Sequence, residues 1–202
     1  VNELNGDINS LMHSIEFDSI HGKWVAEFQK NENYLIINEH KIKTSFVNSI
    51  ELLNLENIDI LIDCTGEKKS SIELSKYFKL GIKKVIVSAP INEPGIANIV
   101  YGVNQTIYNP SQHNIITAAS CTTNCIAPII KVLHENIGIE HGSITTIHNL
   151  TNSQTLIDLP HRDLRRGRSA LNNLIPTTTG SAEAISLIYP ELKGKLNGHA
   201  IR

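Results

Sequence analysis

The sequence predicts an α/β protein built on a parallel sheet, and three stretches carry this prediction. An apolar run at residues 58–64 and a second one at residues 84–87 flank an amphipathic stretch at residues 67–80 that ends before Gly81. Strand, helix and strand in this order form a βαβ unit, whose two strands run parallel. A third, β-branched run at residues 114–117 leads into a longer helical pattern. We therefore expect buried parallel strands that are joined by helices.

Residues 1–50 predict a helix and short strands instead of the apolar runs of the sheet. Residues 4–22 predict a loop and a helix, and residues 24–47 predict strands, clearest at 34–37 and followed by a turn at 38–40. The chain starts at the tip of one extended segment and stops inside another at residues 200–202. We therefore expect it to be a fragment of a longer protein.

Composition narrows the class of protein. The 202 residues carry 18 Lys and Arg against 20 Asp and Glu, a formal net charge of −2, and 41% of them are hydrophobic. This balance gives no reason to expect a nucleic acid or an anionic membrane as the partner. No apolar run is long enough to span a bilayer and no signal-peptide pattern opens the chain, so we expect a cytoplasmic protein. Three cysteines do not form a disulfide framework, and no cysteine or histidine pair completes a zinc site, so we expect no metal.

A rim of polar or small residues is expected at the carboxyl edge of the sheet. The residues that follow the expected strands are Asn2–Glu3, Thr65–Gly66, Ser88–Ala89 and Ser120–Cys121. Carboxyl ends of parallel strands share one edge of a sheet, where ligands bind. No G-x-G-x-x-G occurs in the chain, and in a dinucleotide fold it would precede residue 1. Glu3 has the position of the acid that accepts from both ribose hydroxyls in such a fold, although an isolated glutamate is usually a surface charge.

Residues 118–125, with the sequence Ala-Ala-Ser-Cys-Thr-Thr-Asn-Cys, carry the strongest functional signal. Ser120 is a favourable N-cap, so Cys121 falls in the first turn of the helix that follows. Unpaired backbone N–H groups and the positive end of the helix dipole favour a thiolate there. A buried structural cysteine at a strand–helix junction is the alternative, but the cap and the neighbouring hydroxyls favour a nucleophile. The apolar residues expected to form the buried face of this helix are Ile126, Ile129, Ile130, Leu133 and Ile137. We expect Cys125 to be a packing residue of the same helix and Gly138 to end the helix.

Two further segments offer partners for a nucleophilic thiol. Residues 144–148 form an alternating strand that ends on His148, the best of nine histidines for holding a thiolate and moving protons, although a solvated or core histidine is the usual case. A Gly-Ser step at residues 180–181 follows three threonines and begins a short helix that Pro190 ends. A helix start of this composition is typical of an anion site.

The basic segment at residues 161–168 has three interpretations. A nucleic-acid patch is disfavoured by the overall acidic balance and by the scarcity of aromatic residues. Surface salt bridges or a subunit contact are the plain alternative. Binding of a phosphorylated substrate is the third, because guanidinium groups match phosphate geometry. One thiol, one imidazole, a nucleotide rim and two candidate phosphate sites together predict oxidation of a phosphorylated aldehyde.

The hexapeptide at residues 120–125 resembles the active-site signature of the phosphorylating glyceraldehyde-3-phosphate dehydrogenase family. Segments that resemble this family follow in order along the chain, at residues 18–23, 88–90, 102–104, 145–148, 163–166, 175–180 and 190–196. The resemblance implies a Rossmann-type parallel-sheet NAD-binding domain at residues 1–120, lacking its first strand–helix unit, followed by part of an α+β catalytic domain at residues 121–202. It also implies a homotetramer with a role in glycolysis or gluconeogenesis. Because that first unit is missing, we expect the 202-residue chain alone to be inactive.

The resemblance implies a mechanism and a set of site residues. Cys121 attacks the aldehyde of glyceraldehyde 3-phosphate with His148 as base, hydride passes to NAD, and inorganic phosphate releases 1,3-bisphosphoglycerate from the thioester. The implied ligands of the attacking phosphate are Ser120, Thr122, Arg166, Thr179 and Gly180. The implied ligands of the substrate phosphate are Thr151 and Arg202. The implied cofactor contacts are Glu3, Thr65 and Ser88.

Several positions depart from the usual family pattern. Glu3 stands where the family usually has aspartate, and its charge argues against a 2′-phosphate, which favours NAD. Asn48 stands where an arginine often approaches the adenine. Residues 2–4, 187–190 and 198–200 resemble variants associated with arsenate resistance, in which arsenate replaces phosphate and the product is 1-arseno-3-phosphoglycerate.

Three other interpretations share the architecture. Erythrose-4-phosphate dehydrogenase and aspartate-semialdehyde dehydrogenase carry the same cysteine, and the paired phosphate sites disfavour the semialdehyde. A non-catalytic interaction protein that keeps the fold is the alternative from a different class. Such a protein has no need of the full set of Cys121, His148, Arg166 and Arg202.

Overall fold

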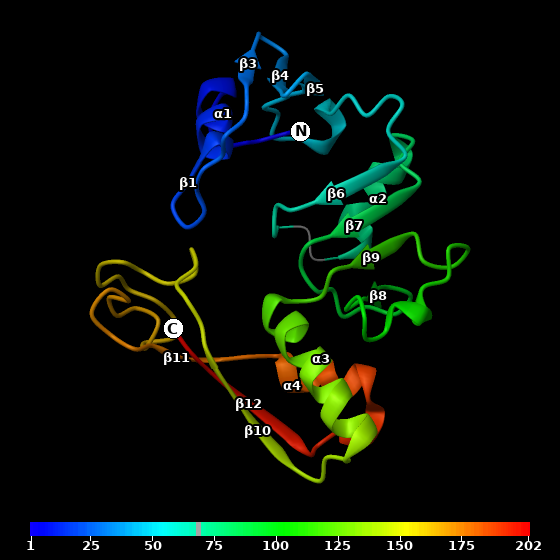
Figure 1. Cartoon of the computed structure of the whole chain (residues 1–202), viewed down its shortest axis with the longest axis vertical. Coiled ribbons are helices and arrows are strands. Elements are labelled where there is room, and N and C mark those ends of the chain that lie inside the picture. The colour runs from blue at the N-terminus through cyan, green and yellow to red at the C-terminus, as the bar shows by residue number, and fades with distance from the viewer. Residues whose placement is uncertain (68–69) are drawn as a thin grey trace. The chain divides into compact units, whose positions relative to one another are not determined.

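The computed structural model describes residues 1–67 and 70–202 and divides into two compact units (Figure 1). The first unit contains Val1–Asp59 and Leu74–Lys83, and the second contains Ile60–Glu73 and Lys84–Arg202. No helix within the described ranges is long and apolar enough to cross a membrane. Residues 68–69, near the start of the stretch expected to form a helix, lie outside the described residues.

Residues 1–59 of the first unit form one α-helix, short antiparallel strands and one short helical turn. Helix α1 (Ile8–Glu16) begins after Asp7, whose carboxylate accepts from the backbone N–H groups of Asn9 and Ser10. Its strands are β1 (Phe17–Asp18), β2 (Gly22–Lys23), β3 (Phe28–Lys30), β4 (Tyr34–Ile37) and β5 (His40–Lys43), followed by the short helix η1 (Ile50–Leu52). β1 pairs with β2, and β3, β4 and β5 form one antiparallel sheet in that order. The helix, the strands and the turn predicted for this region are confirmed.

The second unit contains a four-stranded parallel sheet in the order β6-β7-β9-β8 (Figure 1). Its strands are β6 (Ile60–Asp63), β7 (Lys84–Val87), β8 (Ala97–Asn98) and β9 (Ile115–Thr117). Helix α2 (Ser71–Lys79) connects β6 to β7 along the chain, which confirms the predicted βαβ unit. Val85 and Val87 of β7 are almost completely buried, as expected of a central parallel strand.

The prediction that residues 58–64 form a buried strand is wrong for one face of β6. Ile60 and Ile62 are 55% and 65% exposed, whereas Asp63 is buried. Successive side chains of a strand point to opposite faces, so the two isoleucines share one face. β6 is an edge strand of its sheet, and no segment of the described chain covers that face. Apolar composition predicted the strand but not which of its sides is covered.

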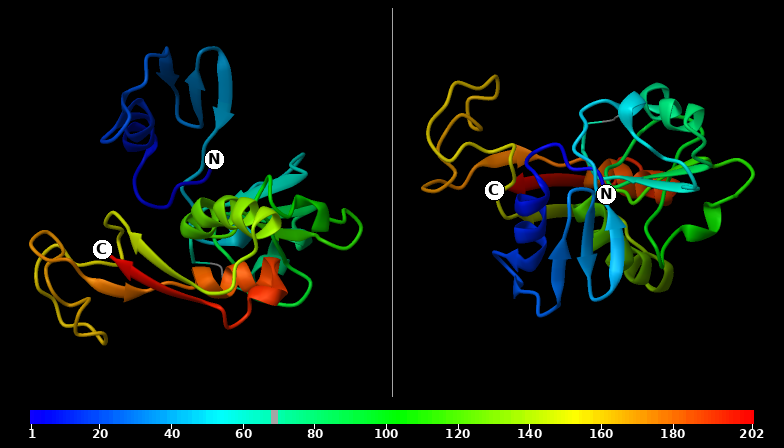
Figure 2. Two further views of the ribbon diagram at one scale, coloured as in Figure 1. Left: turned by 60° about the horizontal axis from the view of Figure 1, so that its bottom comes forward. Right: turned by 90° about the horizontal axis from the view of Figure 1, so that it is seen from above.

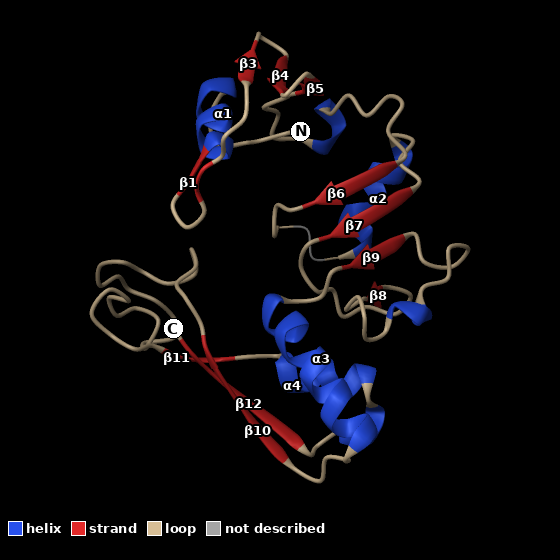
Figure 3. Cartoon of the chain, in the orientation of Figure 1, coloured by secondary structure: helices blue, strands red, loops and turns tan. Residues whose placement is uncertain are grey.

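The remainder of the second unit combines two helices with a second sheet (Figure 3). β10 (Gly142–Ile147) pairs parallel with β12 (Leu196–Ile201), and β11 (Pro176–Thr178) pairs antiparallel with β12. The helices are α3 (Cys121–Asn136) and α4 (Ser181–Ile188), with the short helices η2 (Gln105–Ile107) and η3 (Pro190–Leu192). One core joins these elements through Val100, Ala119, Ala127, Ile130, Ile185 and Leu192. The mixed architecture confirms the predicted α/β fold class.

Helix α3 begins at Cys121 and ends before Gly138, as predicted, but it buries only part of the predicted face, because Ile130 is buried and Ile126 packs partly buried against the core. Its buried residues are Thr123, Ala127 and Ile130. The exposed members of the predicted face are Ile129, Leu133 and Ile137. Cys125, which we expected to pack, is also exposed. Helical spacing defines an apolar stripe, but the neighbouring elements decide which part of the helix they cover.

Candidate active site

Cys121 is the first residue of α3, directly after its N-cap. The Oγ of Ser120 accepts a hydrogen bond from the backbone N–H of Thr123 at 3.1 Å, and the Thr123 hydroxyl lies 2.7 Å from the same oxygen. The hydroxyl of Ser120, a predicted phosphate ligand, is therefore engaged in the cap. The N–H of Cys121 belongs to the first helical turn, where backbone donors have no intrahelical partner. The local sequence thus places a thiol at the positive end of the helix dipole.

A strained backbone turn leads into this helix. Ala119 is buried and has a φ of 54°, a left-handed conformation that is uncommon for a residue other than glycine. Its N–H donates to the hydroxyl of Thr117 at 3.1 Å. Asn124 holds the turn from the helix side, because its Nδ2 donates to the carbonyls of Ala118 at 2.6 Å and Ser120 at 2.9 Å. These bonds offset the strain and fix the position of the thiol.

His148 directly follows β10 and lies against the thiol. Its Nε2 is 3.3 Å from the Sγ of Cys121. The backbone N–H of His148 donates to the carbonyl of Ile201 at 2.8 Å, which extends the parallel pairing of β10 and β12. Figure 2 shows these two strands side by side, β12 in red. The sheet of β10 and β12 therefore positions the imidazole of His148, and the start of α3 positions the thiol of Cys121.

This contact shifts the pKa values of both groups. The hydrogen bond with His148 lowers the pKa of the Cys121 thiol below its ordinary value of 9.0, and bonds with Thr122 act in the same direction while partial burial opposes them. The hydrogen bond with Cys121 raises the pKa of His148 above 6.5, and the Asn149 carbonyl acts in the same direction. Burial and the positive charge of Arg202 oppose this rise in the pKa of His148. The pair therefore favours a thiolate, the reactive form of a cysteine nucleophile.

Arg202 follows β12 and contacts the far side of the same imidazole. Its Nη1 lies 2.7 Å from the Nδ1 of His148 and donates to the carbonyl of Asn149 at 3.0 Å. That carbonyl is itself 2.8 Å from Nδ1. The resemblance assigns Arg202 to the substrate phosphate, and the structure places it beside the predicted base.

The hydroxyls predicted to bind the attacking phosphate lie at the starts of two helices. The Oγ1 of Thr122 is 3.9 Å from the Sγ of Cys121. At the start of α4, the Oγ1 of Thr179 lies 2.8 Å from the hydroxyl of Ser181 and accepts from its N–H at 3.3 Å, and Gly180 is the N-cap. Both positions combine hydroxyl groups with the free N–H groups of a first helical turn, which suits an anion.

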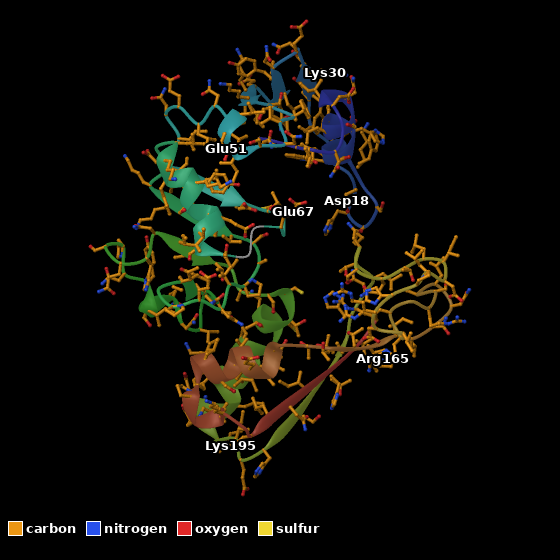
Figure 4. All side chains as sticks on the ribbon, turned by 180° about the vertical axis from the view of Figure 1, so that it is seen from behind. Asp18, Lys30, Glu51, Glu67, Arg165 and Lys195 are labelled. Carbon is orange, nitrogen blue, oxygen red and sulfur yellow. The ribbon has the colours of Figure 1, made fainter. Side chains whose placement is uncertain are left out.

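Two other predicted phosphate ligands lie on the irregular segment that follows β10. The Nε of Arg166 is 3.6 Å from a carboxylate oxygen of Asp163, and Arg165 binds the same carboxylate through Nε and Nη2 at 3.1 Å each. Figure 4 labels Arg165 on this segment. The hydrogen bond with Arg165 is the main cause that lowers the pKa of Asp163, and the positive charge of Arg166 acts in the same direction. The Oγ1 of Thr151 lies 3.1 Å from the Oε1 of Gln154. Within the described chain the structure does not bring Arg166 or Thr151 into hydrogen-bond contact with the thiol.

The predicted cofactor contacts follow neighbouring parallel strands and the start of the chain. After β6, the N–H and hydroxyl of Thr65 donate to the Oδ1 of Asp63 at 3.0 and 2.7 Å. After β7, the N–H of Ser88 donates to the Asp63 carbonyl at 3.0 Å. Both hydroxyl-bearing side chains are exposed. Glu3 belongs to the first unit, where its carboxylate accepts from the N–H of Asn5 at 2.8 Å. Hydroxyl and carboxylate oxygens can accept hydrogen bonds from sugar hydroxyls, and the assignment of these three residues to a cofactor stays a prediction.

Three residues of the site were not predicted from the sequence, and two of them carry little signal there. Asn149 contributes a backbone carbonyl, which any residue type supplies, and Ala119 adopts a conformation that its side chain does not favour. Asn124 has a recognisable signal, because its side chain lies one helical turn after the N-cap, within reach of the cap carbonyl. No cluster of three or more His, Cys, Asp or Glu side chains in the described ranges is placed to hold a metal ion.

An exposed thiol at a helix N-terminus, paired with an imidazole next to a parallel sheet, defines a class of α/β proteins with a cysteine nucleophile. Comparison with known proteins narrows this class. Residues 1–71 match the NAD binding domain of glyceraldehyde 3-phosphate dehydrogenase, and residues 120–202 match its C-terminal domain. The chain belongs to the glyceraldehyde-3-phosphate dehydrogenase family, as its signature hexapeptide predicts.

Curated relatives support the same assignment. The chain is 49% identical to glyceraldehyde-3-phosphate dehydrogenase 3 of Nostoc sp., 48% identical to glyceraldehyde-3-phosphate dehydrogenase of Geobacillus stearothermophilus and 46% identical to glyceraldehyde-3-phosphate dehydrogenase 1 of Bacillus subtilis. Each alignment covers 100% of this chain and 60% of the relative. The chain therefore spans less than two thirds of the length of these relatives. The predicted division into domains after residue 120 stays a prediction.

Proposed function

We propose that the protein containing this chain oxidises glyceraldehyde 3-phosphate to 1,3-bisphosphoglycerate, with NAD and inorganic phosphate as co-substrates. The observation that carries this proposal is the 3.3 Å contact between Cys121 and His148 at the start of α3. A purely structural cysteine needs neither an exposed position nor an imidazole partner, whereas Cys121 has both. Membership of the family supports the choice of substrate and cofactor.

The residues of the site suit each step of this oxidation. The Nε2 of His148 takes the thiol proton, and the thiolate of Cys121 attacks the aldehyde carbon. The oxyanion that forms is stabilised by the backbone N–H of Cys121 and receives this proton from Nε2, which gives the thiohemiacetal hydroxyl. The Nε2 of His148 takes the hydroxyl proton as hydride leaves the same carbon. Bound NAD supplies the hydride acceptor. A phosphate oxygen then attacks the thioester carbon, the C–S bond breaks, and the acyl phosphate leaves the restored thiolate.

The binding roles are part of the same proposal. The attacking phosphate is assigned to Ser120, Thr122, Arg166, Thr179 and Gly180, the substrate phosphate to Thr151 and Arg202, and NAD to Glu3, Thr65 and Ser88. The position of Thr122, with its hydroxyl 3.9 Å from the Sγ of Cys121, supports the first assignment. We further propose a cytoplasmic homotetramer, with residues 1–120 in the NAD-binding domain and residues 121–202 in the catalytic domain.

The test measures NADH formation. It uses the longest reading frame that contains these residues, because this chain spans 60% of its relatives. Cys121→Ser should lower the rate with glyceraldehyde 3-phosphate, NAD and phosphate by roughly 1000-fold or more, since a serine hydroxyl is not ionised near neutral pH. Cys64→Ser and Cys125→Ser are matched controls, because both thiols are exposed, and they should keep the activity.

Two outcomes contradict the enzyme proposal. One is an undiminished rate in Cys121→Ser. The other is no NADH from the protein with intact Cys121, which would favour the non-catalytic interaction protein. Exchanging phosphate for arsenate, or glyceraldehyde 3-phosphate for erythrose 4-phosphate, in the same assay compares kcat/KM for the nearest alternatives.

A further inference from the structure

The Nδ1 of His148 lies within hydrogen-bond distance of one donor and one acceptor. The Nη1 of Arg202 lies 2.7 Å away and can only donate, because a guanidinium has no acceptor. The carbonyl of Asn149 lies 2.8 Å away and can only accept. A protonated Nδ1 can donate a hydrogen bond to the Asn149 carbonyl, but its N–H then points at the N–H of Arg202. An unprotonated Nδ1 can instead accept a hydrogen bond from Arg202. The two hydrogen bonds therefore exclude each other.

In the structure, the Nη1 of Arg202 lies within hydrogen-bond distance of both the Nδ1 of His148 and the carbonyl of Asn149. This Nη1 donates to the Asn149 carbonyl at 3.0 Å, so this carbonyl does not need a proton from the imidazole. Nδ1 is then an acceptor, and the neutral ring carries its proton on Nε2, which faces the Sγ of Cys121 at 3.3 Å. A nitrogen that already carries a proton cannot take another one. In this state His148 supports the thiolate as a donor but cannot act as a base.

Arg202 is fixed by its backbone, but its side chain is incompletely paired. The N–H and the carbonyl of Arg202 pair with Ile175 at 2.9 and 2.8 Å. Its buried Nε has no hydrogen-bond partner in the described part of the chain, and a buried donor without a partner costs free energy. A phosphate group offers several acceptor oxygens that match the fork of a guanidinium. Such a ligand therefore competes with Nδ1 for the side chain.

We propose that Arg202 is a positioning residue that withholds the base function of His148 until a phosphorylated ligand draws its guanidinium off Nδ1. The inference rests on the proposed function, because it gives the predicted phosphate anchor a second task. After release, the ring proton moves through solvent from Nε2 to Nδ1 and is donated to the Asn149 carbonyl. Nε2 then has a free lone pair for the hydroxyl proton of the thiohemiacetal. Only N–H bonds are made and broken, and the charge of the ring does not change.

Two groups face the imidazole of His148, and they have opposite effects on its pKa. From α3 the thiol of Cys121 contacts the ring, and from the end of β12 the guanidinium of Arg202 does. Contact with Cys121 raises the pKa of His148, and the positive charge of Arg202 lowers it. Withdrawal of Arg202 therefore raises the pH at which the ring titrates.

The test observes the ring nitrogens of His148 by NMR in protein made with isotope-labelled histidine, because protonated and unprotonated ring nitrogens have well-separated shifts. His148→Gln identifies the signals among those of nine histidines. Glycerol 3-phosphate is the probe, since it carries a phosphate but no aldehyde, and glycerol is its control. At a pH where the ring is neutral, the proton should lie on Nε2 without ligand and on Nδ1 with glycerol 3-phosphate. The titration midpoint of the ring should rise, because the positive charge of Arg202 no longer lowers it.

Variants of Arg202 make the test independent of ligand binding. Arg202→Met removes the charge and the donor, so the proton should lie on Nδ1 without any ligand, whereas Arg202→Lys keeps a donor and should restore the Nε2 form. Arg168→Met is the matched control, because this guanidinium pairs with Asp158 at 2.7 Å, and it should behave as the unmodified chain does. The signals of His134, whose Nε2 is 2.9 Å from Glu191, report whether the fold is retained.

Three results overturn the proposal. They are a proton on Nδ1 in the ligand-free unmodified chain, an unchanged ring spectrum throughout the titration with glycerol 3-phosphate, and an Nε2 proton that persists in Arg202→Met while the His134 signals stay in place. None of these measurements needs NAD or turnover. A protein that shows the switch but forms no NADH therefore refutes the proposed function alone.

Discussion

The Sγ of Cys121 and the Nε2 of His148 lie 3.3 Å apart, although 27 positions separate them in the sequence. An isolated thiol is mostly protonated near neutral pH and is a poor nucleophile. The contact combines the start of α3 with the end of β10, so the reactivity of the thiol depends on two elements at once.

Iodoacetamide should modify Cys121 near neutral pH in preference to Cys64 and Cys125. All three thiols are exposed, so access does not distinguish them, whereas the bond with His148 lowers the pKa of Cys121. A lowered pKa keeps the thiolate present as the pH falls below the range of an ordinary thiol, so the rate at Cys121 should decline only at lower pH. His148→Gln should slow this alkylation roughly tenfold near neutral pH, because the variant loses the bond that lowers the pKa of Cys121 and less of the thiol is then ionised. Peptide mass spectrometry gives the rates, and equal labelling of the three thiols contradicts the expectation.

Asn124→Ala should loosen the turn that carries the thiol. The variant loses two bonds, to the carbonyls of Ala118 and Ser120, so the free energy of unfolding in urea should fall by about 1–2 kcal/mol and alkylation of Cys121 should slow. Asn136→Ala is the control, because its amide bonds a carbonyl near the other end of α3 at 2.8 Å. The control should leave alkylation unchanged, and an equal effect of both substitutions on alkylation counts against the proposed role of Asn124.

Gly198→Ala should weaken binding of the attacking phosphate. A Cβ at this position would lie 2.9 Å from the Cγ2 of Thr179, so Thr179 must shift. Loss of one phosphate hydrogen bond should raise the KM for phosphate roughly tenfold, equivalent to about 1.4 kcal/mol, with little change in the KM for the aldehyde. Asn197→Ala, an exposed neighbour on the same strand, should change neither constant. A rise in both constants for Gly198→Ala would indicate general disruption instead.

Asn98→Ala should destabilise the segment that follows β7 and Ser88. Its side chain accepts from the N–H of Ile91 at 3.1 Å and the hydroxyl of Thr117 at 2.6 Å, and donates to the carbonyl of Ile91 at 2.8 Å. Truncation leaves these partly buried groups unpaired, at a cost of about 2–4 kcal/mol in the free energy of unfolding. Asn92→Ala, at an exposed position of the same segment, should cost less than about 0.5 kcal/mol. Similar urea midpoints for the two variants would show that the network does not stabilise the segment.

Elements with local signals could be predicted from the sequence. The cap at Ser120, the end of α3 at Gly138 and the turn at residues 38–40 each depend on one or two residue types at fixed positions. Burial could not be predicted in the same way. Ile60 of β6 and Ile129 of α3 are exposed because burial depends on which elements lie alongside, and neither apolar composition nor helical spacing contains that information.

The candidate site shows the same division between local and distant signals. Cys121 could be singled out from its neighbours alone, whereas His148 could be ranked first only by its place at a strand end. Their contact depends on the pairing of residues 142–147 with residues 196–201, about fifty positions further along the chain. The contact between Arg202 and the imidazole could not be predicted, because the family pattern assigns this arginine to a phosphate.

The left-handed backbone of Ala119 has a consequence for the response of the site to heat. This conformation costs about 1–2 kcal/mol for a residue with a side chain, and the bonds from Asn124 and to Thr117 offset it only while they hold. Ala119 is itself a member of the hydrophobic core, so its turn is held until that core opens. On warming, the thiol should therefore keep its imidazole partner, and its reactivity, up to the temperature of global unfolding.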